Sequence, residues 1–472
     1  MPALLTLRRQ TTPGVFRHIG ATTEQLGTTG SLGAAEDSAV AENSSKRVVV
    51  VRDYLLCANR GNVYKLASPF SAATAWTLST ALTGYQTLSD AAQTGLHRML
   101  IDNKPVVVCA YRDTTGGTNI RIATYDVTAE TWSFSGALAH TAGIIGSIGH
   151  SFVHRNKIYA VVDNGTFGDL RVLVIDPVAL SVSTISGPTF EKNVSAAFAE
   201  WNGDLYLGPV YITAGGFTSL LRVTGGSFVV ETTGAITSDN TFHNITGRGS
   251  MWTTTHGLWA TWMDSVSPKK RLSLFTGTPG AISETDKTSL LPVGWSADQT
   301  NHKESVYQVQ NAGAEPTTHI FYATDGTSGG SIQRFTFVDD VTALTDDGAQ
   351  AGAGDWAFVS STQGGGEYEF TPSQQTIEIL DIQRTLGGME ISYALYGGGT
   401  ANVAFYHEGG ATSPDSVPKT LASIDTASGG LTITANVIQT VPADGATRTV
   451  RWLPTTDGYS IGDNVELVPY FS

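Results

Sequence analysis

Residues 155–187 constrain the fold more than any other stretch, because they read as one complete small β-unit. Three short runs in it are rich in β-branched and aromatic residues, and Asn164-Gly165 and Asp176-Pro177 supply turns between them. The runs are 158–162, 170–175 and 181–185. With residues 150–154 as a first strand, the unit predicts a four-stranded sheet, which cannot bury both faces alone. Such a sheet needs similar sheets stacked beside it.

Similar units recur along the chain. If Tyr159 marks the second strand of the unit, comparable residues follow one another 47 to 62 positions apart, near the ~40–50 residues typical of propeller blades. They are Leu55, Val107, Tyr159, Tyr206, Trp259 and Phe321. The next strand keeps step, 14 or 15 residues later, at Val174, Leu221, Leu274 and Phe335. The spacing predicts a β-propeller of about six blades.

Small residues stand two positions after each marker, where close packing of neighbouring sheets requires them. They are Cys57, Cys109, Val161, Gly208, Thr261 and Ala323. Charged residues make up only 15% of the 472 residues while glycine numbers 52, which favours many short strands with tight turns over helices. The sequence therefore predicts an all-β protein.

The chain divides into four predicted segments. Residues 1–46 are polar and predict an extended N-terminal arm, and 47–345 hold the propeller. Residues 346–366 are rich in Gly and Asp and predict a linker. Residues 367–472 show about seven alternating strands and predict a β-sandwich. How the ring closes stays open at this stage, with a strand from the arm as one route.

The arm keeps a few apolar residues near its start, including Leu4, Val15 and Phe16, which suits docking into a neighbouring subunit. We therefore expect removal of residues 1–46 to leave the propeller folded and to weaken assembly. A lowered melting temperature would instead indicate that the arm completes a blade.

Charge and targeting signals exclude several classes of protein. The net charge of −14 argues against nucleic-acid binding by phosphate neutralisation, although it is compatible with a surface that DNA passes without adhering. Two arginines follow the apolar residues of the N-terminus, which makes it a poor secretory signal, and no run approaches the ~20 apolar residues of a membrane span. We expect a soluble protein made without a signal peptide.

Motifs of catalysis are absent from the sequence: it has no GxSxG, GxxxxGK[ST], HExxH or CxxC. The acidic loop 339–347 lacks the ligand order of an EF-hand, so solvated turns are the favoured interpretation, with ion binding left open. Ser296-Ala297-Asp298 lacks the glycine of a sialidase-type box. We expect no catalytic residues, no metal and no cofactor.

A few side chains have both a structural and a functional interpretation. Cys57 and Cys109 are expected to be free core thiols, with a disulfide or metal pair as the alternative. His150 and His154 share one face of a strand, where packing is favoured over a metal or proton relay. Trp252, Trp259 and Trp262 are expected in the core, with stacking on sugars as the alternative.

Several short segments carry a resemblance to a known family. They are TTPG (Thr11–Gly14), RGNVYKL (Arg60–Leu66), GSIQRF (Gly330–Phe335), DDG (Asp346–Gly348) and WAFVSS (Trp356–Ser361). With these the chain resembles virion β-propeller proteins of tailed bacteriophages, in particular the nozzle (tail tubular) proteins of short-tailed phages. The Thr/Gly/Ala-rich residues 20–45 depart from what is expected of nozzles.

The resemblance implies a non-enzymatic structural protein of the virion tail, made in the host cytoplasm and forming a homo-oligomeric ring around exiting DNA. Its implied partners are an adaptor, a fibre or further copies of itself. Two alternatives stay open: a receptor-binding fibre, tip or head-decorating protein that binds host-surface glycans, and a glycan-cleaving propeller enzyme.

Overall fold

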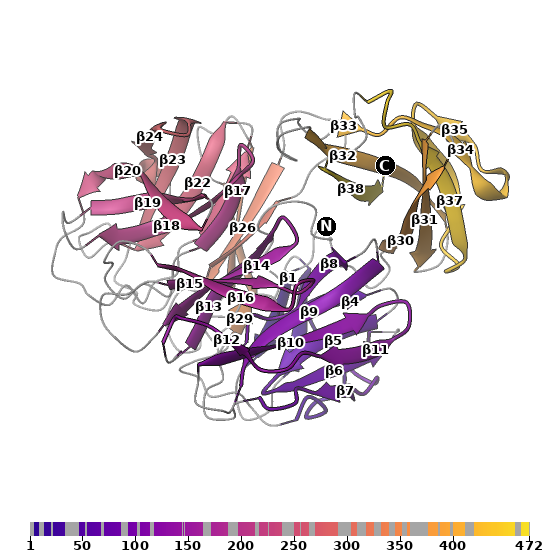
Figure 1. Ribbon diagram of the computed structural model, residues 1–472, viewed down its shortest axis with the longest axis horizontal. Coiled ribbons are helices and arrows are strands. Elements are labelled where there is room, and N and C mark those ends of the chain that lie inside the picture. Colours follow the sequence, from indigo (N-terminus) through magenta and orange to yellow (C-terminus); the bar gives the residue numbers. More distant parts are fainter. Residues whose placement is uncertain are drawn as a thin grey trace.

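The computed structural model shows an all-β chain whose sheets form a large ring and a smaller layered domain (Figure 1). It describes residues 4–8, 14–19, 22–33, 47–51, 54–67, 70–85, 93–101, 104–113, 118–143, 145, 147–163, 171–186, 197–212, 217–224, 226–237, 250–254, 256–263, 270–290, 304–308, 318–324, 332–338, 345–351, 356–358, 376–385, 388–396, 400–410, 420–457 and 464–471. Helix in these ranges is limited to two 3₁₀ turns, η2 (Thr288–Leu290) and η3 (Ser428–Gly430).

Seven antiparallel sheets build the ring, and we number them from the N-terminus. Sheet 1 contains β29 (Trp356–Phe358), β1 (Leu4–Arg8), β2 (Gly14–Ile19) and β3 (Thr22–Leu26). Sheet 2 contains β4 (Val48–Val51), β5 (Tyr54–Asn59), β6 (Asn62–Ala67) and β7 (Thr77–Ala81). Sheet 3 contains β8 (His97–Ile101), β9 (Lys104–Arg112), β10 (Asn119–Asp126), β11 (Thr131–Phe134) and β12 (Leu138–Ala139). Sheet 4 contains β13 (Ser147–His154), β14 (Lys157–Asp163), β15 (Arg171–Asp176) and β16 (Ser181–Ser186).

The remaining ring sheets keep the same order from the innermost to the outermost strand. Sheet 5 contains β17 (Ala197–Trp201), β18 (Asp204–Ile212), β19 (Phe217–Thr224) and β20 (Ser227–Thr237). Sheet 6 contains β21 (Ser250–Thr254), β22 (Gly257–Met263), β23 (Lys270–Thr278) and β24 (Ala281–Asp286). Sheet 7 contains β25 (Glu304–Gln308), β26 (Thr318–Thr324), β27 (Ile332–Val338) and β28 (Thr345–Ala351).

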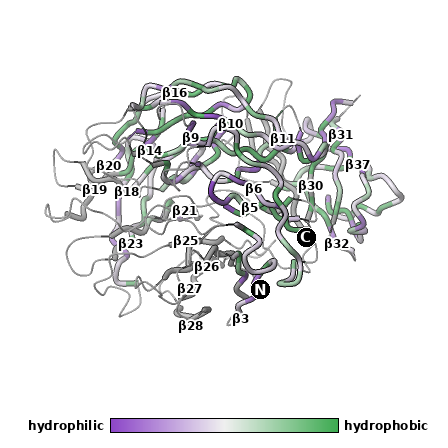
Figure 2. The backbone as a smooth tube through the Cα atoms, turned by 90° about the horizontal axis from the view of Figure 1, so that it is seen from below, coloured by the Kyte–Doolittle hydropathy of each residue, from purple (hydrophilic) through white to green (hydrophobic). Residues whose placement is uncertain are grey.

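Hydrophobic cores lie between neighbouring sheets, as radial stacking requires, and hydrophobic (green) stretches recur around the ring in Figure 2. Successive interfaces from sheet 1 to sheet 6 are filled by buried side chains from both partners. Examples are Leu26 with Leu55, Leu56 with Val107, Ile122 with Ile158, Val161 with Leu205, and Leu220 with Leu258. Strands β21 and β25 join sheets 6 and 7, and β28 contacts β2 and β3 of sheet 1. Sheets 1 to 7 therefore form a closed β-propeller. Together with the two C-terminal sheets described below, this confirms the predicted fold class of a propeller followed by a sandwich.

The two ends of the propeller segment meet in sheet 1. Strand β29 is its innermost strand and pairs with β1, and the N-terminal residues supply the three outer strands. Three expectations are corrected here. Residues 1–46 include three strands where an extended arm was predicted, and residues 346–366 include β29 and most of β28 where a linker was predicted. The described sheets give seven blades where about six were predicted. The added blade escaped the repeat search because its strands come from two distant segments.

The predicted repeat markers all lie on second strands, β5, β9, β14, β18, β22 and β26. Tyr159 is directly opposite Val174, Trp259 opposite Leu274, and Phe321 opposite Phe335. Leu221 is shifted by one residue and pairs with Leu207, next to a register shift in that strand pair. A constant hairpin length therefore explains most of the periodicity that the sequence showed.

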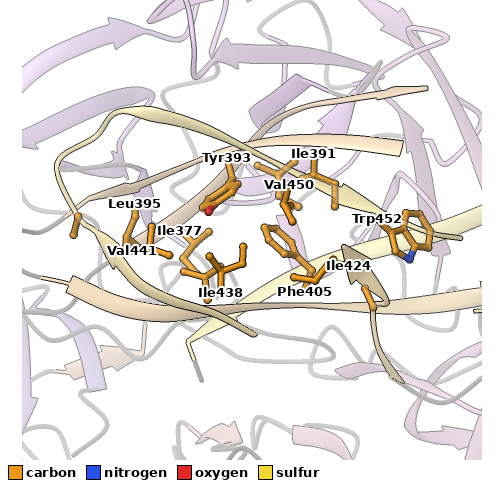
Figure 3. Close-up of a cluster of buried hydrophobic side chains, with 14 residues drawn as sticks. Ile377, Ile391, Tyr393, Leu395, Phe405, Ile424, Ile438, Val441, Val450 and Trp452 are labelled. Atoms are coloured by element: carbon orange, nitrogen blue, oxygen red, sulfur yellow. The ribbon is translucent and has the colours of Figure 1, made fainter. Parts of the chain in front are cut away.

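Residues 376–471 form two further sheets beside the ring (Figure 1). Sheet 8 contains β30 (Thr376–Thr385), β31 (Gly388–Tyr396), β34 (Ile424–Ala427) and β37 (Thr447–Trp452). Sheet 9 contains β32 (Thr400–Gly410), β33 (Thr420–Leu421), β35 (Ile433–Thr434), β36 (Val437–Pro442) and β38 (Asn464–Phe471). Side chains of both sheets form one core, shown in Figure 3, and strand β30 contacts β9 of the propeller.

Asp457 fixes the turn at the edge of this core. Its carboxylate accepts hydrogen bonds from Trp452 Nε1 (2.6 Å), Ser423 N (2.9 Å) and Ser423 Oγ (2.5 Å). Trp452 is 2% exposed, so removing the carboxylate takes a short hydrogen bond away from a buried indole N–H.

Asp457→Ala is therefore expected to destabilise the sandwich by about 2–4 kcal/mol, measured by chemical denaturation. Asp425→Ala, which removes the exposed ion pair with Arg451, is the control and should change stability little. Equal effects of the two substitutions would contradict this role of Asp457.

No helix in the described part of the chain is long and apolar enough to cross a membrane.

Candidate functional site

Cys57 and Cys109 are buried free thiols on β5 and β9, as predicted. Cys57 packs in the core between sheets 1 and 2, and Cys109 in the core between sheets 2 and 3. Burial raises the pKa of each thiol to about 12, and the positive charge of Arg47 offsets this only in part. Because the thiolate is the nucleophile, neither cysteine is suited to catalysis.

We expect both thiols of the native protein to resist a maleimide reagent at pH 8 and to react fully after unfolding. A raised pKa keeps the thiols protonated at pH 8, and burial excludes the reagent. Mass spectrometry before and after denaturation counts the labelled sites. Rapid labelling of the native protein would contradict the burial of these residues.

His150 and His154 face sheet 5 from the innermost strand of sheet 4, on either side of the buried Phe152, as the alternation predicted. His150 Nδ1 accepts a hydrogen bond from the backbone N–H of Phe198 at 3.3 Å, and the two rings are 5.9 Å apart. His154 Nδ1 lies 3.1 Å from Glu200 Oε2. Both histidines join neighbouring blades, and the described residues contain no group of three metal-ligating side chains.

A buried serine–histidine pair, which the sequence analysis did not single out, joins sheets 3 and 4. Ser151 Oγ lies 2.9 Å from His97 Nε2 and donates a hydrogen bond to Thr94 O at 2.5 Å. Ser151 is 0% exposed and His97 is 1% exposed. A serine whose proton is held by a carbonyl, in a site closed to solvent, serves packing between blades and not nucleophilic attack. The residues lie 54 positions apart, so sequence spacing gave no signal for the pair.

The tryptophans of sheet 6 belong to the core where the structure describes their side chains. Trp252 and Trp259 are directly opposed on β21 and β22, with nearly parallel rings 6.2 Å apart. They are 4% and 3% exposed, so they offer no face for a sugar. The side chain of Trp262 lies outside the described set.

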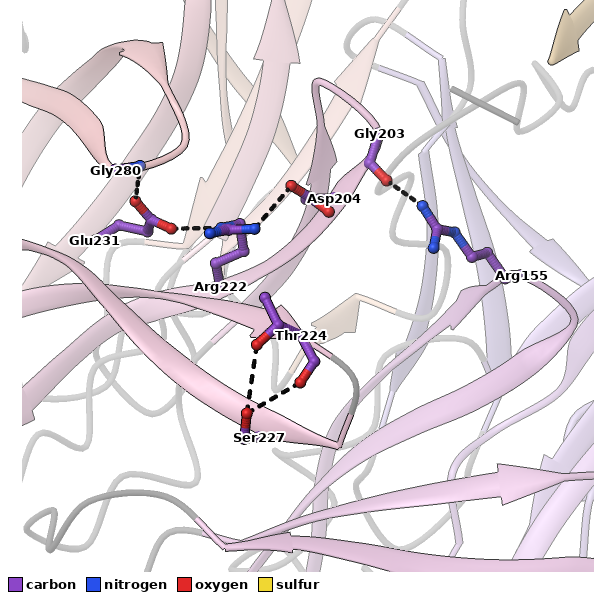
Figure 4. A network of polar contacts seen from close by, with 8 residues as sticks. All are labelled: Arg155, Gly203, Asp204, Arg222, Thr224, Ser227, Glu231 and Gly280. Carbon is purple, nitrogen blue, oxygen red and sulfur yellow. Dashed lines mark hydrogen bonds and ion pairs between the residues drawn. The ribbon is translucent and has the colours of Figure 1, made fainter. Parts of the chain in front are cut away.

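A charged network joins the outer parts of sheets 5 and 6 (Figure 4). Arg222 pairs with Glu231, and its Nη1 lies 3.3 Å from Asp204 Oδ2. Glu231 Oε2 accepts a hydrogen bond from the backbone N–H of Gly280, in the outer turn of sheet 6, at 2.6 Å. Burial opposes the charge of Arg222, but the two carboxylates outweigh it and raise the pKa of the guanidinium. Nearby, Arg155 donates to Gly203 O across the boundary of sheets 4 and 5 at 2.8 Å.

Two acidic segments that the sequence analysis considered lie mostly outside the described residues. Residues 339–344 and 296–298 lie outside the described residues, and Asp346 and Asp347 are described only as part of the backbone of β28. The ion-binding alternative for the 339–347 loop therefore stays a prediction. Among the described polar contacts, those of His154, Ser151, Arg155 and Glu231 connect neighbouring blades.

No known protein-family profile matches the chain, and no curated protein does. Solved structures similar to it include the N-terminal domain of Nup159, at 12% identity over 76% of this chain and 88% of that one, with a TM-score of 0.39. A putative 6-phosphogluconolactonase from Bacteroides fragilis shares 13% identity over 74% and 97% of the two chains, with a TM-score of 0.41. The WD40 domain of SCAP from fission yeast shares 8% identity over 64% and 73%, with a TM-score of 0.34. Each TM-score is below 0.5, so the propeller assignment depends on the sheets of this chain themselves.

Proposed function

We propose that this chain is a non-enzymatic structural protein of a tailed-bacteriophage virion, a tail component of the nozzle type that works through interfaces with other virion proteins. The observation that carries the proposal is the position of the segments that resemble that family. They come from the two ends of the propeller sequence, yet their described residues lie in the closing sheet and the two sheets beside it.

The N-terminal and the late segments lie in one sheet, on either side of β1. TTPG ends at Gly14, the first residue of β2, and WAFVSS begins with the three residues of β29. Strand β1 lies between them, with Arg8 opposite both Gly14 and Trp356. GSIQRF and DDG contribute to the neighbouring strands β27 and β28. If the members of a family share the way in which their ring closes, the segments that they share should lie at the closure. The segments of this chain that resemble the family lie there.

RGNVYKL forms the turn between β5 and β6 and most of β6, in the sheet next to this closure. Arg60 and Gly61 take positive φ angles of 46° and 74° between the paired residues Asn59 and Asn62, as a two-residue turn requires. A Cβ on Gly61 would lie 2.4 Å from Tyr85 Cδ1, so the turn packs too closely for a side chain. Leu66 then enters the core shared with sheet 1. The turn geometry and the packing of Leu66 therefore explain why these residues occur in this chain.

The charge of the chain agrees with this role. A protein with a net charge of −14 repels DNA, so a surface that lines an exit path would let DNA pass without adhering. In this proposal the partners are an adaptor, fibres or further copies of the chain. Contact with DNA is transient and independent of sequence.

Disruption of the coding sequence in the phage that carries it tests the proposal. We expect heads without complete tails, restored by the intact chain supplied in trans, and immunogold labelling at the tail end of intact particles. Labelling at fibre tips together with binding to a glycan array would favour the receptor-binding alternative. Normal particles from the disrupted phage would overturn the proposal.

A further inference from the structure

Strand β13, the innermost strand of sheet 4, is irregular where it faces sheet 5. Its pairing with β14 shifts between Ile148 and Ser151, so that β13 has one extra residue there. A bulge of this kind bends a strand and redirects a side chain. The bulge contains His150, whose ring lies 5.9 Å from the ring of Phe198 on β17, the innermost strand of sheet 5. The irregularity thus places a histidine at the boundary where β13 contacts β17.

His150 makes a hydrogen bond that only a neutral imidazole can make. Its Nδ1 accepts the backbone N–H of Phe198 at 3.3 Å. A protonated imidazole carries hydrogen on both ring nitrogens and cannot accept a hydrogen bond. Protonation of His150 therefore sets two donors against each other, at a position where Phe198 is 0% exposed. The beginning of β17 then loses this link to β13.

The far end of the same boundary responds to acid in the opposite way. His154 Nδ1 lies 3.1 Å from Glu200 Oε2, and a proton added to His154 turns this contact into an ion pair. Beside it, Arg155 donates to Gly203 O at 2.8 Å (Figure 4), and this bond keeps its strength because arginine stays protonated. Acid thus weakens one end of the boundary and holds the other closed.

Other titratable groups beside this boundary keep their protonation state at mildly acidic pH. Tyr159 of β14 contacts the rings of His154 and Phe198, and burial raises the pKa of its hydroxyl, so it stays neutral. Lys157, at the start of β14, pairs with Asp176. Burial opposes the charge of Asp176, but hydrogen bonds from its own turn and from Lys157 outweigh burial and hold the pKa of that carboxyl below its usual range.

Two further histidines lie near sheet 4 but on the side of sheet 3. His97 Nε2 lies 2.9 Å from Ser151 Oγ at the boundary of sheets 3 and 4. His140 Nδ1 accepts the N–H of Ala142 at 3.2 Å in the link that precedes sheet 4, and burial lowers the pKa of His140. His140 therefore also responds to acid, at a position away from β17, which makes it suitable as a control.

We propose that the boundary between sheets 4 and 5 is an acid-sensitive joint, in which protonation of His150 releases the beginning of β17 while His154 and Arg155 keep the other end closed. The folded joint needs the neutral ring, so the unfolded chain binds this proton more readily. The stability of the joint is therefore complete above about pH 6.5, the ordinary pKa of histidine, and is lost as the pH falls. Carboxylates keep their charge down to about pH 4, so the joint opens between about pH 4.5 and 6 while the other blades stay folded.

Hydrogen–deuterium exchange of the purified chain, followed by mass spectrometry and corrected for the intrinsic pH dependence of exchange, tests the proposal. We compare about pH 7.5 with about pH 5, on either side of the ordinary histidine pKa. The peptide that contains β17 should lose protection at least about tenfold at the lower pH. A peptide that contains β10 of sheet 3 should keep its protection, because the opening is local.

His150→Asn is the decisive variant. The side-chain oxygen of Asn is as many bonds from Cα as Nδ1 of His, and it accepts a hydrogen bond at either pH. In this variant β17 should keep its protection at about pH 5. His154→Gln removes the contact that acid strengthens, so the loss of protection at the lower pH should extend to residues 201–204.

His140→Asn makes the same change at the control position and should leave the pH dependence of β17 as it is in the wild type. If His150→Asn destabilises the chain at about pH 7.5, His150→Gln, which also has an oxygen acceptor that does not titrate, provides the same test. Equal protection of β17 at both pH values in the wild type would overturn the proposal. So would a pH dependence that survives in the His150 variants, or one that His140→Asn abolishes. The result does not depend on the virion assignment, because exchange is measured on the purified chain alone.

Discussion

Deletion of residues 1–46 is expected to prevent the propeller from folding, in contrast to the tolerance predicted from the sequence. The segment supplies three of the four strands of sheet 1. Its buried Val15, Leu26 and Leu32 pack against sheet 2, and each contributes about 1.5–3 kcal/mol by burial. Their loss alone is comparable with the ~5–15 kcal/mol net stability of a domain, before the exposed faces of sheets 2 and 7 are counted.

Polar contacts of the same segment add to this loss. Trp76 Nε1 donates a hydrogen bond to Leu26 O at 2.9 Å, and the buried Asn59 donates to Leu32 O at 2.7 Å. Deletion removes both of these acceptors and exposes the side chains of Trp76 and Asn59 at a newly opened surface. We therefore expect insoluble protein, or a cooperative melting transition that is lost in calorimetry and near-UV circular dichroism.

Deletion of residues 1–3, which precede β1, is the matched control and should leave the transition intact. A variant without residues 1–46 that melts like the wild type would show that a six-sheet ring can close by itself. That result would restore the interpretation of the segment as an arm.

The sequence predicted the interior of the propeller and missed its closure for a definite physical reason. Sheets 2 to 7 are contiguous hairpins, so a constant spacing appears in the residues of their second strands, such as Tyr159 and Trp259. Sheet 1 has no such spacing, because β29 and β1 are separated by almost the whole propeller. Strand β29 is also only three residues long, which is too short to show alternation.

Composition misled the interpretation of residues 1–46 because their buried face is partly polar. Arg17 is 5% exposed within β2, and its charge is paired with Glu24 of β3. Polar composition indicates disorder only when the polar groups stay in water. Here an ion pair and backbone pairing on both sides of β2 allow a Thr-rich segment to form a blade.

The positions of candidate side chains were predicted correctly where the residue type alone favours the core. They were missed where the interacting residues are far apart in the sequence. The cysteines and the Trp252–Trp259 pair follow the general preference of these residue types for the core. The Arg222 network and the Ser151–His97 pair depend on residues in different blades. Which side chains meet across a blade boundary follows from the twist and radial position of the sheets, and single-sequence periodicity does not contain that information.

A disulfide across the ring closure is expected to stabilise the propeller more than one placed in any hairpin. The pairing of β29 with β1 has three directly opposed residue pairs, whereas first and second strands of sheets 2 to 7 have four to six. It also joins the most distant segments, so a cross-link there constrains the unfolded chain most. The chain-entropy relation gives about 5–6 kcal/mol for a loop of about 350 residues, compared with about 3 kcal/mol for a loop of 15.

Leu7→Cys with Ala357→Cys is the first variant, and Thr6→Cys with Phe358→Cys is the second, because both are directly opposed pairs. Adjacent pairs in an antiparallel ladder alternate between wide and narrow spacing, so one of the two suits a disulfide. Cys57 and Cys109 will not compete, since burial raises the pKa of each thiol to about 12.

The oxidised form of the better pair should melt at least about 5 °C above its own reduced form, measured by calorimetry. The reduced form and each single-cysteine variant are the controls. If both oxidised pairs form and neither raises the melting temperature, unfolding of the propeller starts elsewhere than at the contact between β1 and β29.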